Sequence, residues 1–233
     1  MKNRLLLLSF VVWMILLCSC QKDLGLYVTT SIPVPEFKEL KQDASVDIVL
    51  TQGARYNVSF EGFEDILADL SFNVIRGKLI ITQHGHYWSS GKSTIFITVP
   101  DLSLIEITSS GNVEGSYRFI PGGPMQIEMQ GSGDLDMFID VERLTTRLDG
   151  SGDLRLRGYA DNHDIEIDGS GRIYAYNLVT YKMRLNHFGS NQVEVNVANN
   201  LIVRLRGSGN VYFIGNPFLD YSVTGSGRLI DAN

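Results

Sequence analysis

Four acidic side chains recur beside a repeated Gly-Ser-Gly motif, and their spacing is the first feature that could support chemistry. Asp149 and Asp168 lie two residues before the central serine of a motif, whereas Asp134 and Asp153 lie two residues after one. Carboxylates stacked in this way could bind a hard cation such as Ca²⁺. However, Arg172 follows in the second column and can neutralise it, and Asp favours turns for local reasons. We expect no bound metal and treat these four acids as weak candidates.

The same acids raise the question of catalysis. As an acid/base pair, Asp149 and Asp168 would need a cleft and at least one raised pKa. The Gly-Ser-Gly motif recurs too often to be a nucleophile elbow, and the sequence has no P-loop and no dinucleotide fingerprint. The repeats vary too little in length to build a cleft from loops. We therefore predict a protein that is not an enzyme and uses no cofactor, with a carbohydrate-active enzyme on a β-helix as the alternative.

A second cluster combines histidines with aromatic residues. His84 and His86 would lie on one face of a strand, but the sequence offers no third metal ligand. Together with Tyr87 and Trp88 they form a candidate ligand-binding loop, because exposed aromatic rings can stack on a sugar or seat a protein partner. The simpler interpretation, which we favour, is that Tyr87 and Trp88 pack over the end of the core.

The N-terminus resembles the signal peptide of a bacterial lipoprotein. Lys2 and Arg4 precede an apolar stretch from Leu5 to Leu17, which is shorter than the ~20 residues of a membrane span. The segment Leu17-Cys18-Ser19-Cys20 that follows matches a lipobox. We predict removal of residues 1–19 and lipidation of Cys20, which would anchor the protein to the outer membrane. The alternative is an uncleaved N-terminal anchor helix.

Residues Gln21-Lys22-Asp23 resemble the start of the surface-export signal of Bacteroidota lipoproteins, although Leu24 interrupts the acidic run. This favours the cell surface over the periplasmic face. The formal net charge of −6 and the absence of a Lys/Arg cluster argue against a nucleic-acid partner.

An internal repeat dominates the rest of the chain. The central serines of five Gly-Ser-Gly motifs and two degenerate copies are Ser110, Ser132, Ser151, Ser170, Ser190, Ser208 and Ser226. Their spacing of 18 to 22 residues indicates a solenoid. Apolar residues alternate with polar ones on both sides of each motif, as in half-buried strands. The sequence therefore predicts an all-β protein, a parallel β-helix-like solenoid, with a chain of antiparallel hairpins as the alternative.

The repeat also predicts how its corners are built. We expect the corner glycines to have positive φ, and we expect stacked corners to have little room for a Cβ. The serine hydroxyls should hydrogen-bond along their own column. His187 falls in an inward column and should be buried, whereas His163 lies in the looser turn between strands and should be solvated.

The chain divides into four parts. Residues 1–19 are the signal peptide, 20–35 a Pro- and Thr-containing tether, 36–104 an N-terminal β-rich segment that caps the first coil, and 105–233 the solenoid repeats. A short helical turn is expected from Glu64 to Leu70. At the other end the chain stops at Asn233, soon after the last motif, so the final coil should leave an uncovered strand edge. We expect it to pack against a second copy or another partner; alternatively, Phe218 and Tyr221 fold inward.

Several segments together resemble a known family. They are the runs Val46 to Gly53 and Gly77 to Ile81, the step from Thr98 to Leu102, and the serial Gly-Ser-Gly coils. This combination is similar to the putative autotransporter adhesin, head GIN domain, a Bacteroidota envelope family of unknown function, over about residues 36–230. The resemblance implies a parallel β-helix-like fold and carries no catalytic residues. We predict a non-enzymatic envelope lipoprotein that serves as an adhesin-like binding or scaffolding module, with a glycan or a protein as its ligand.

Overall fold

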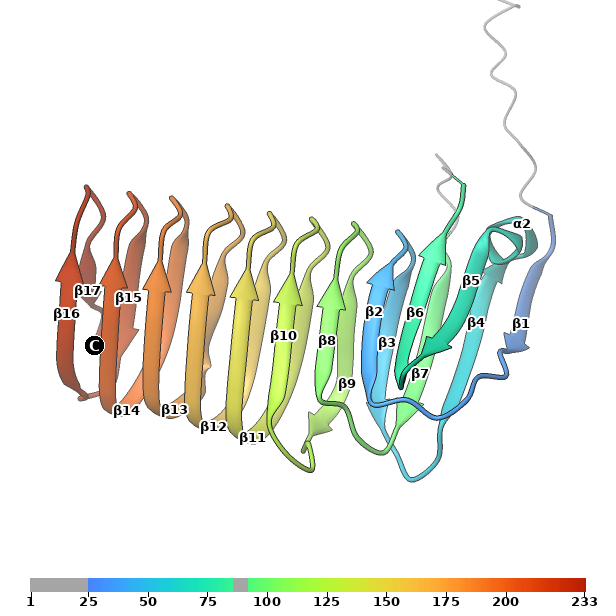
Figure 1. Cartoon of the computed structure of the whole chain (residues 1–233), viewed down its shortest axis with the longest axis horizontal. Coiled ribbons are helices and arrows are strands. Elements are labelled where there is room, and N and C mark those ends of the chain that lie inside the picture. Colours follow the sequence, from blue (N-terminus) through green and yellow to red (C-terminus); the bar gives the residue numbers. More distant parts are fainter. Residues whose placement is uncertain (1–24, 86–91) are drawn as a thin grey trace, which may run out of the picture.

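The computed structural model describes residues 25–85 and 92–233. About 63% of the chain is strand and 2% is helix, and the strands form a β-solenoid of about 7 turns of roughly 19 residues (Figure 1). Successive coils pair in parallel and, apart from local bulges, in register, which confirms the solenoid and excludes the chain of antiparallel hairpins. Within the described residues no helix has the length and apolar character to cross a membrane.

Each coil has two walls joined by two turns. After a Gly-Ser-Gly corner the chain enters wall 1, bends at a second turn, and returns along wall 2 to the next corner (Figure 1). Wall 1 contains β7 (Thr94–Val99), β3 (Asp47–Gln52), β9 (Val113–Phe119), β15 (Asn210–Ile214) and β17 (Leu229–Asp231). Wall 2 contains β6 (Lys78–Gln83), β2 (Glu39–Asp43), β8 (Leu104–Ile107), β10 (Met125–Met129) and β16 (Phe218–Val223). Four long strands bend around the second turn and contribute to both walls: β11 (Leu135–Leu148), β12 (Leu154–Ile167), β13 (Ile173–His187) and β14 (Gln192–Leu205).

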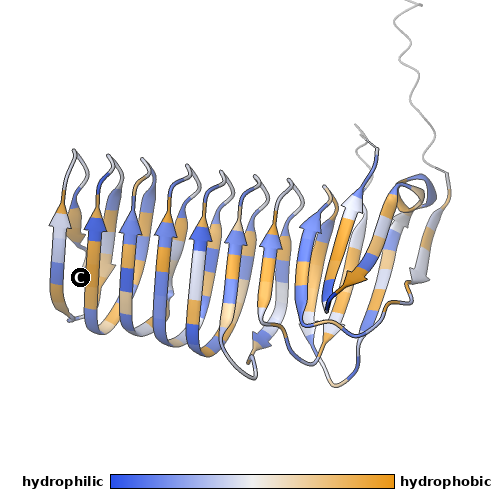
Figure 2. Cartoon of the chain, in the orientation of Figure 1, coloured by the Kyte–Doolittle hydropathy of each residue, from blue (hydrophilic) through white to orange (hydrophobic). Residues whose placement is uncertain are grey.

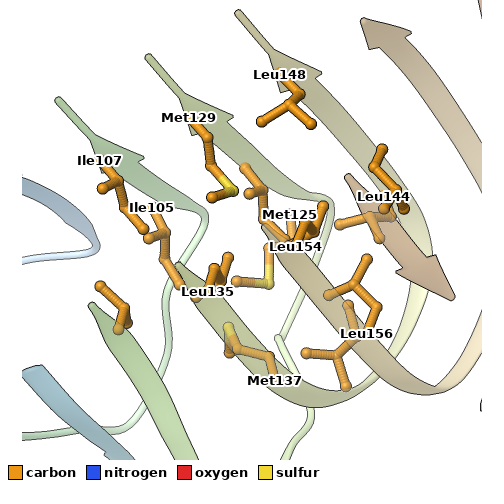
Figure 3. Packing of buried hydrophobic residues seen from close by; sticks show 14 of the residues in the cluster. Ile105, Ile107, Met125, Met129, Leu135, Met137, Leu144, Leu148, Leu154 and Leu156 are labelled. Atoms are coloured by element: carbon orange, nitrogen blue, oxygen red, sulfur yellow. The ribbon is translucent and has the colours of Figure 1, made fainter. Parts of the chain in front are cut away.

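Alternation along each strand builds the core. Buried and more exposed residues alternate along most of β11 and β14, and the hydropathy changes with the same period (Figure 2). Because the coils are in register, inward residues stack in columns. One column of wall 2 runs through Ile105, Ile127, Thr146, Ile165, Leu185 and Val203. Figure 3 shows such residues from wall 2 pointing toward Leu135 and Leu154 of wall 1.

The N-terminal part adds coils out of sequence order. β2 and β3 pair in parallel with β8 and β9, so the solenoid pairing begins at Glu39. β6 and β7, which come later in the chain, lie on the other side of β2 and β3 and also pair with them in parallel. These strands of the N-terminal β-rich segment therefore continue the walls of the repeats.

Antiparallel strands close this end of the solenoid. β4 (Asn57–Phe63) pairs antiparallel with β7, and β1 (Tyr27–Ser31) pairs antiparallel with β4. β5 (Leu70–Ile75) pairs antiparallel with β6. The short helix α2 (Glu64–Ala68), which confirms the expected helical turn, connects β4 to β5 and buries Ile66 (Figure 1). Because these strands run against the direction of the coils, they end the parallel stacking.

The corner glycines are required by the close approach of successive coils. A Cβ built on Gly152 would clash with the carbonyl oxygen of Gly133, and one on Gly171 would clash with that of Gly152. The expected positive φ is wrong for nearly all of them: among the corner glycines of the described chain, Gly225 alone has a positive φ, of +132°. The backbone is ordinary, and the missing side chain is what lets the coils stack.

The far end of the solenoid is open. β16 pairs with β14, and all six of its residues are exposed. Phe218 continues an outward column and is 74% exposed, whereas Tyr221 continues an inward column and is still 57% exposed, so the alternative in which both fold inward and are buried is wrong.

Candidate functional site

The acids at the corners are tied into the backbone of the neighbouring coil. The Asp134 carboxylate accepts a hydrogen bond from the backbone N–H of Asp153 at 2.8 Å, and the Asp153 carboxylate accepts one from Arg172 N–H at 3.2 Å. The same position in earlier coils does likewise, since Asp47 accepts from Asn112 N–H (3.0 Å) and Asn112 from Asp134 N–H (2.9 Å). These Asp and Asn side chains form a ladder that holds the coils together.

Arginines neutralise most of this charge. Arg155 contacts Asp134 at 3.1 Å and Asp153 at 3.2 Å, so the structure brings these two candidates together around a guanidinium. The Asp149 carboxylate contacts Arg147 Nε at 2.8 Å. Within the described residues, no group of three or more His, Cys, Asp or Glu is arranged to hold a metal ion.

Asp149 and Asp168 lie at the corners of adjacent coils, where the Asp168 N–H donates to Leu148 O at 3.0 Å. Asp168 is exposed, and neither acid lines the two cavities of wall 2. Their arrangement suits corner building better than acid/base chemistry, which needs a cleft around the bond to be broken.

The serine column is only partly as expected. Ser110 Oγ and Ser45 Oγ lie 3.0 Å apart, which joins two corners through their hydroxyls. Ser132, Ser151 and Ser170 have side chains that are not buried. Coil-to-coil hydrogen bonding at these corners is instead provided by the Asp and Asn ladder and by backbone bonds such as Ser151 N–H to Gly131 O (2.9 Å).

The candidate aromatic loop lies largely outside the described residues. His84 is exposed, and its backbone N–H donates to Asp69 O at 2.9 Å. His86, Tyr87 and Trp88 fall within residues 86–91, and Cys20 falls within residues 1–24, so their predicted roles remain predictions.

The expectation that His163 is solvated is wrong. Its side chain is 1% exposed, because it occupies an inward column of wall 2 between Leu144 and Met183. Burial lowers the pKa of His163 to about 3, so the imidazole is neutral. Its Nε2 lies 2.9 Å from Thr146 Oγ1, and its Nδ1 has no hydrogen-bond partner in the described chain. Inward residues lie three and five positions before the central serine of each motif, and His163 lies seven positions before Ser170. Extending the period-2 alternation by one more step would therefore have identified this inward column.

His187 is buried, as predicted. Its Nε2 lies 3.2 Å from Asn191 O, and burial lowers the pKa of its imidazole. The residue fills an inward column of wall 2 that also contains Ile167 and Leu205. This histidine therefore has a structural role in the core.

Two cavities lie side by side on wall 2. We call the larger one, of about 290 Å³, the basic groove; its polar lining includes Arg143, Asn162, Asp164, Lys182, Arg184 and Asn200. The smaller one, of about 220 Å³, contains the carboxylates Glu128, Asp164 and Glu166 and the cations Arg147 and Arg184. Both cavities share Asp164 and Arg184, so they form one continuous polar surface.

Parallel register explains the basic groove. Arg143, Asn162, Lys182 and Asn200 occupy one outward column just after the second turn. Two residues further along each coil, Asp164 and Arg184 pair in the next outward column. Since strands are about 4.8 Å apart, side chains of four successive coils line one elongated surface. None of these residues belonged to the candidate set from the sequence.

Two exposed tyrosines lie at the second turn beside the basic groove. Tyr159 and Tyr181 are 41% and 44% exposed. The Tyr159 hydroxyl donates to Asp161 at 2.8 Å, and this hydrogen bond raises the pKa of Tyr159. Lys182 Nζ lies 5.8 Å from the centre of the Tyr181 ring, which places that ring next to a cation of the groove.

The sequence matches the family model "Putative auto-transporter adhesin, head GIN domain" over residues 36–217. The chain belongs to this GIN-domain family. No curated protein matches the sequence. Membership in this adhesin-like family of unknown function indicates a cell-surface or envelope protein, and the family carries no enzymatic description.

Solved structures support the same fold. A putative adhesin from Bacteroides fragilis is similar with a TM-score of 0.84 and 23% identity, over 88% of this chain and 96% of that one. A putative adhesin from Parabacteroides distasonis has a TM-score of 0.72 and 19% identity, over 88% and 96%. A protein from the same organism named as a putative lipid binding protein has a TM-score of 0.70 and 21% identity, over 89% and 98%. At these identities the likeness establishes the GIN-domain fold alone.

Proposed function

We propose that the protein is a non-enzymatic, lipid-anchored binding module of the outer membrane that faces the outside of the cell. The observation that carries the proposal is the continuous polar surface of wall 2, held on a solenoid whose coils are in register. Binding residues on such a scaffold need little ordering when a ligand arrives, which favours affinity. The lipobox at Cys20 and the following Gln21-Lys22-Asp23 support the anchor and its surface orientation.

The side chains that could have been catalytic support binding over turnover. Asp134 and Asp153 contact Arg155 and accept backbone hydrogen bonds, and Asp149 contacts Arg147. Carboxylates engaged in this way stabilise the coils. A ligand of wall 2 would instead be held by exposed cations and amides.

Binding and turnover on the same ligands test this function. The chain lacking residues 1–20 keeps every described strand and can be applied to an array of polysaccharides and to intact cells. We expect saturable binding to at least one of these surfaces without release of new reducing ends. Release of sugar fragments would favour the carbohydrate-active alternative, and absence of binding to any surface would contradict an adhesive role. Vesicles serve as a further arm, because one structural neighbour is named as a putative lipid binding protein.

We further propose that a second copy covers the open end. Leu219, Tyr221 and Val223 of β16 continue the buried columns of β14, but no further described coil covers them. The opposite end is closed by antiparallel strands, so the available arrangement is β16 against β16 of the second copy. Antiparallel pairing centred on Tyr221 keeps inward residues together, whereas pairing centred on Asp220 would oppose two carboxylates.

A further inference from the structure

We propose that the basic groove binds an acidic saccharide. In this arrangement Arg143, Lys182 and Arg184 contact its carboxylate or sulfate groups, and Tyr159 and Tyr181 contact its sugar rings. The inference rests on the proposed binding function and assigns a ligand class to one part of wall 2.

The charge of the groove is the first argument. Three cations and one carboxylate line it, although the whole chain has a formal net charge of −6. Within residues 25–85 and 92–233, neither Arg143, Lys182 nor Arg184 has a carboxylate at ion-pair distance. Other arginines of the solenoid do, for example Arg157 with Asp136 at 2.7 Å and Arg204 with Asp220 at 3.0 Å. Uncompensated guanidinium groups on one surface favour an anion, which they can contact in a bidentate manner.

A buried polar atom is the second argument, and it favours a ligand with hydroxyl groups. Asn200, in the outward column, lines the groove with a buried, unpartnered Oδ1, whereas His163 points into the core from an inward column and lies out of reach of a ligand. A buried polar atom without a partner is destabilising, because it has lost its hydrogen bonds to water. A hydroxyl both donates and accepts, so it can donate to the Asn200 oxygen. A simple anion such as phosphate offers fewer donors for this purpose.

Dimensions and aromatic residues complete the argument. Arg143 and Lys182 lie two coils apart, about 10 Å along the solenoid, so adjacent acidic units of a chain can each reach a cation. The cavity of about 290 Å³ lies just below the roughly 300–1,000 Å³ of typical ligand sites, and it suits one or two sugar units of a longer polymer. The exposed Tyr159 and Tyr181 precede the groove residues Asn162 and Lys182 in their coils, and they offer apolar ring faces with a polar tip, which suits the faces of sugar rings.

Isothermal titration of the chain lacking residues 1–20 tests the groove. The probes are oligogalacturonate as the carboxylate form, a chondroitin sulfate oligosaccharide as the sulfated form, maltotetraose as the neutral form, and inorganic phosphate. We expect at least one acidic saccharide to bind at least tenfold tighter than maltotetraose and phosphate. Its affinity should fall as salt is raised. The double variant Arg143→Ala/Arg184→Ala should lose at least tenfold in affinity for that saccharide.

A matched control separates the groove from net charge. Arg157→Ala also removes an exposed arginine, but one paired with Asp136 on wall 1, and it should change affinity by less than twofold. All variants should keep the wild-type circular dichroism spectrum, because the substituted side chains are exposed. Equal binding by wild type and the double variant, or a preference for the neutral saccharide or phosphate, overturns the groove assignment. Wild-type binding to other polysaccharides or to cells would then still support the proposed function, whereas binding to none of these surfaces contradicts both.

Discussion

Substitution of a corner glycine by alanine isolates the contact on which coil stacking depends. A Cβ on Gly152 would lie less than 3.0 Å from the Gly133 carbonyl oxygen, a separation that Cβ atoms do not tolerate. The obstacle is backbone, so it cannot rotate away as a side chain would. Because the φ of Gly152 lies outside the left-handed region, Gly152→Ala tests the steric clash alone.

The expected loss of stability can be worked from the neighbouring contacts. Overpacking a rigid site costs about 1–3 kcal/mol. Moving the corner away from its neighbour also weakens two coil-to-coil hydrogen bonds, Ser151 N–H to Gly131 O at 2.9 Å and Asp153 N–H to Asp134 Oδ1 at 2.8 Å, each worth about 1 kcal/mol. Together these give about 3–5 kcal/mol, a large part of the roughly 5–15 kcal/mol that stabilises a typical protein.

Urea unfolding followed by circular dichroism measures this loss. The matched control is Gly123→Ala, because a Cβ at Gly123 would have no atom within 4 Å. Its free energy of unfolding should change by less than about 0.5 kcal/mol. Ser151→Ala, an exposed position in the same corner, should cost at most about 1 kcal/mol. If Gly152→Ala unfolds at the same urea concentration as Gly123→Ala, the close stacking of corners is refuted.

Four further predictions address other parts of the molecule. Asp134→Ala removes the acceptor for Asp153 N–H and should destabilise by about 1–3 kcal/mol, whereas Asp134→Asn keeps an acceptor and should cost less; equal urea midpoints for the two would contradict the ladder. Buried His163 has a pKa of about 3, against 6.5 in the unfolded chain. The free energy of unfolding that depends on this neutral imidazole is therefore complete above pH 6.5 and is lost as the pH falls toward 3. At pH 5 the loss is about 2 kcal/mol, and a His163→Gln protein should show a smaller decrease in urea midpoint between pH 7 and 5; parallel decreases would disprove this origin. Cys20→Ala should release the protein from membrane fractions or leave an unprocessed precursor, and unchanged fractionation with the lipid label intact would rule out the lipobox. The chain lacking residues 1–20 should sediment as a dimer that Tyr221→Asp converts to a monomer; a wild-type monomer at high concentration argues against pairing through β16.

The sequence predicts the repeated coils well because their determinants are local. Each corner needs small residues where coils touch, and each strand needs alternating apolar residues, so both signals recur with every coil. The coil formed by β2 and β3 gives no such signal. Its corner, Ala44-Ser45-Val46, stacks on Ser110 through the 3.0 Å contact between serine hydroxyls, yet 65 residues separate the two serines. Strands β4 to β7 occupy that interval, and periodicity along the chain cannot detect stacking of coils that are not consecutive.

The candidate site is harder to predict from sequence than the fold. The corner acids are conspicuous because they recur beside the motif, but the structure uses them as backbone acceptors. The basic groove arises from Arg143, Lys182 and Arg184, which lie on two coils separated by the coil of Asn162 and are up to 41 positions apart. Only the exact register of the strands shows that these side chains share a surface, and only the structure shows which cations lack a carboxylate partner.

The two turns of each coil therefore have different freedom to vary. At the Gly-Ser-Gly corner, backbone approaches backbone so closely that a Cβ does not fit, and at several corners an Asp or Asn side chain accepts a hydrogen bond from the next coil's N–H. On wall 2 after the second turn, outward side chains such as Lys182 meet no such constraint, so their identity can change without disturbing the stack. Recognition should follow this division: corner substitutions should lower stability while folded protein keeps its ligand affinity, and substitutions such as Arg184→Ala should lower affinity at unchanged stability. A binding site on the corner side would have to change residues that the solenoid requires, and this physical conflict is the reason to look for the ligand on wall 2.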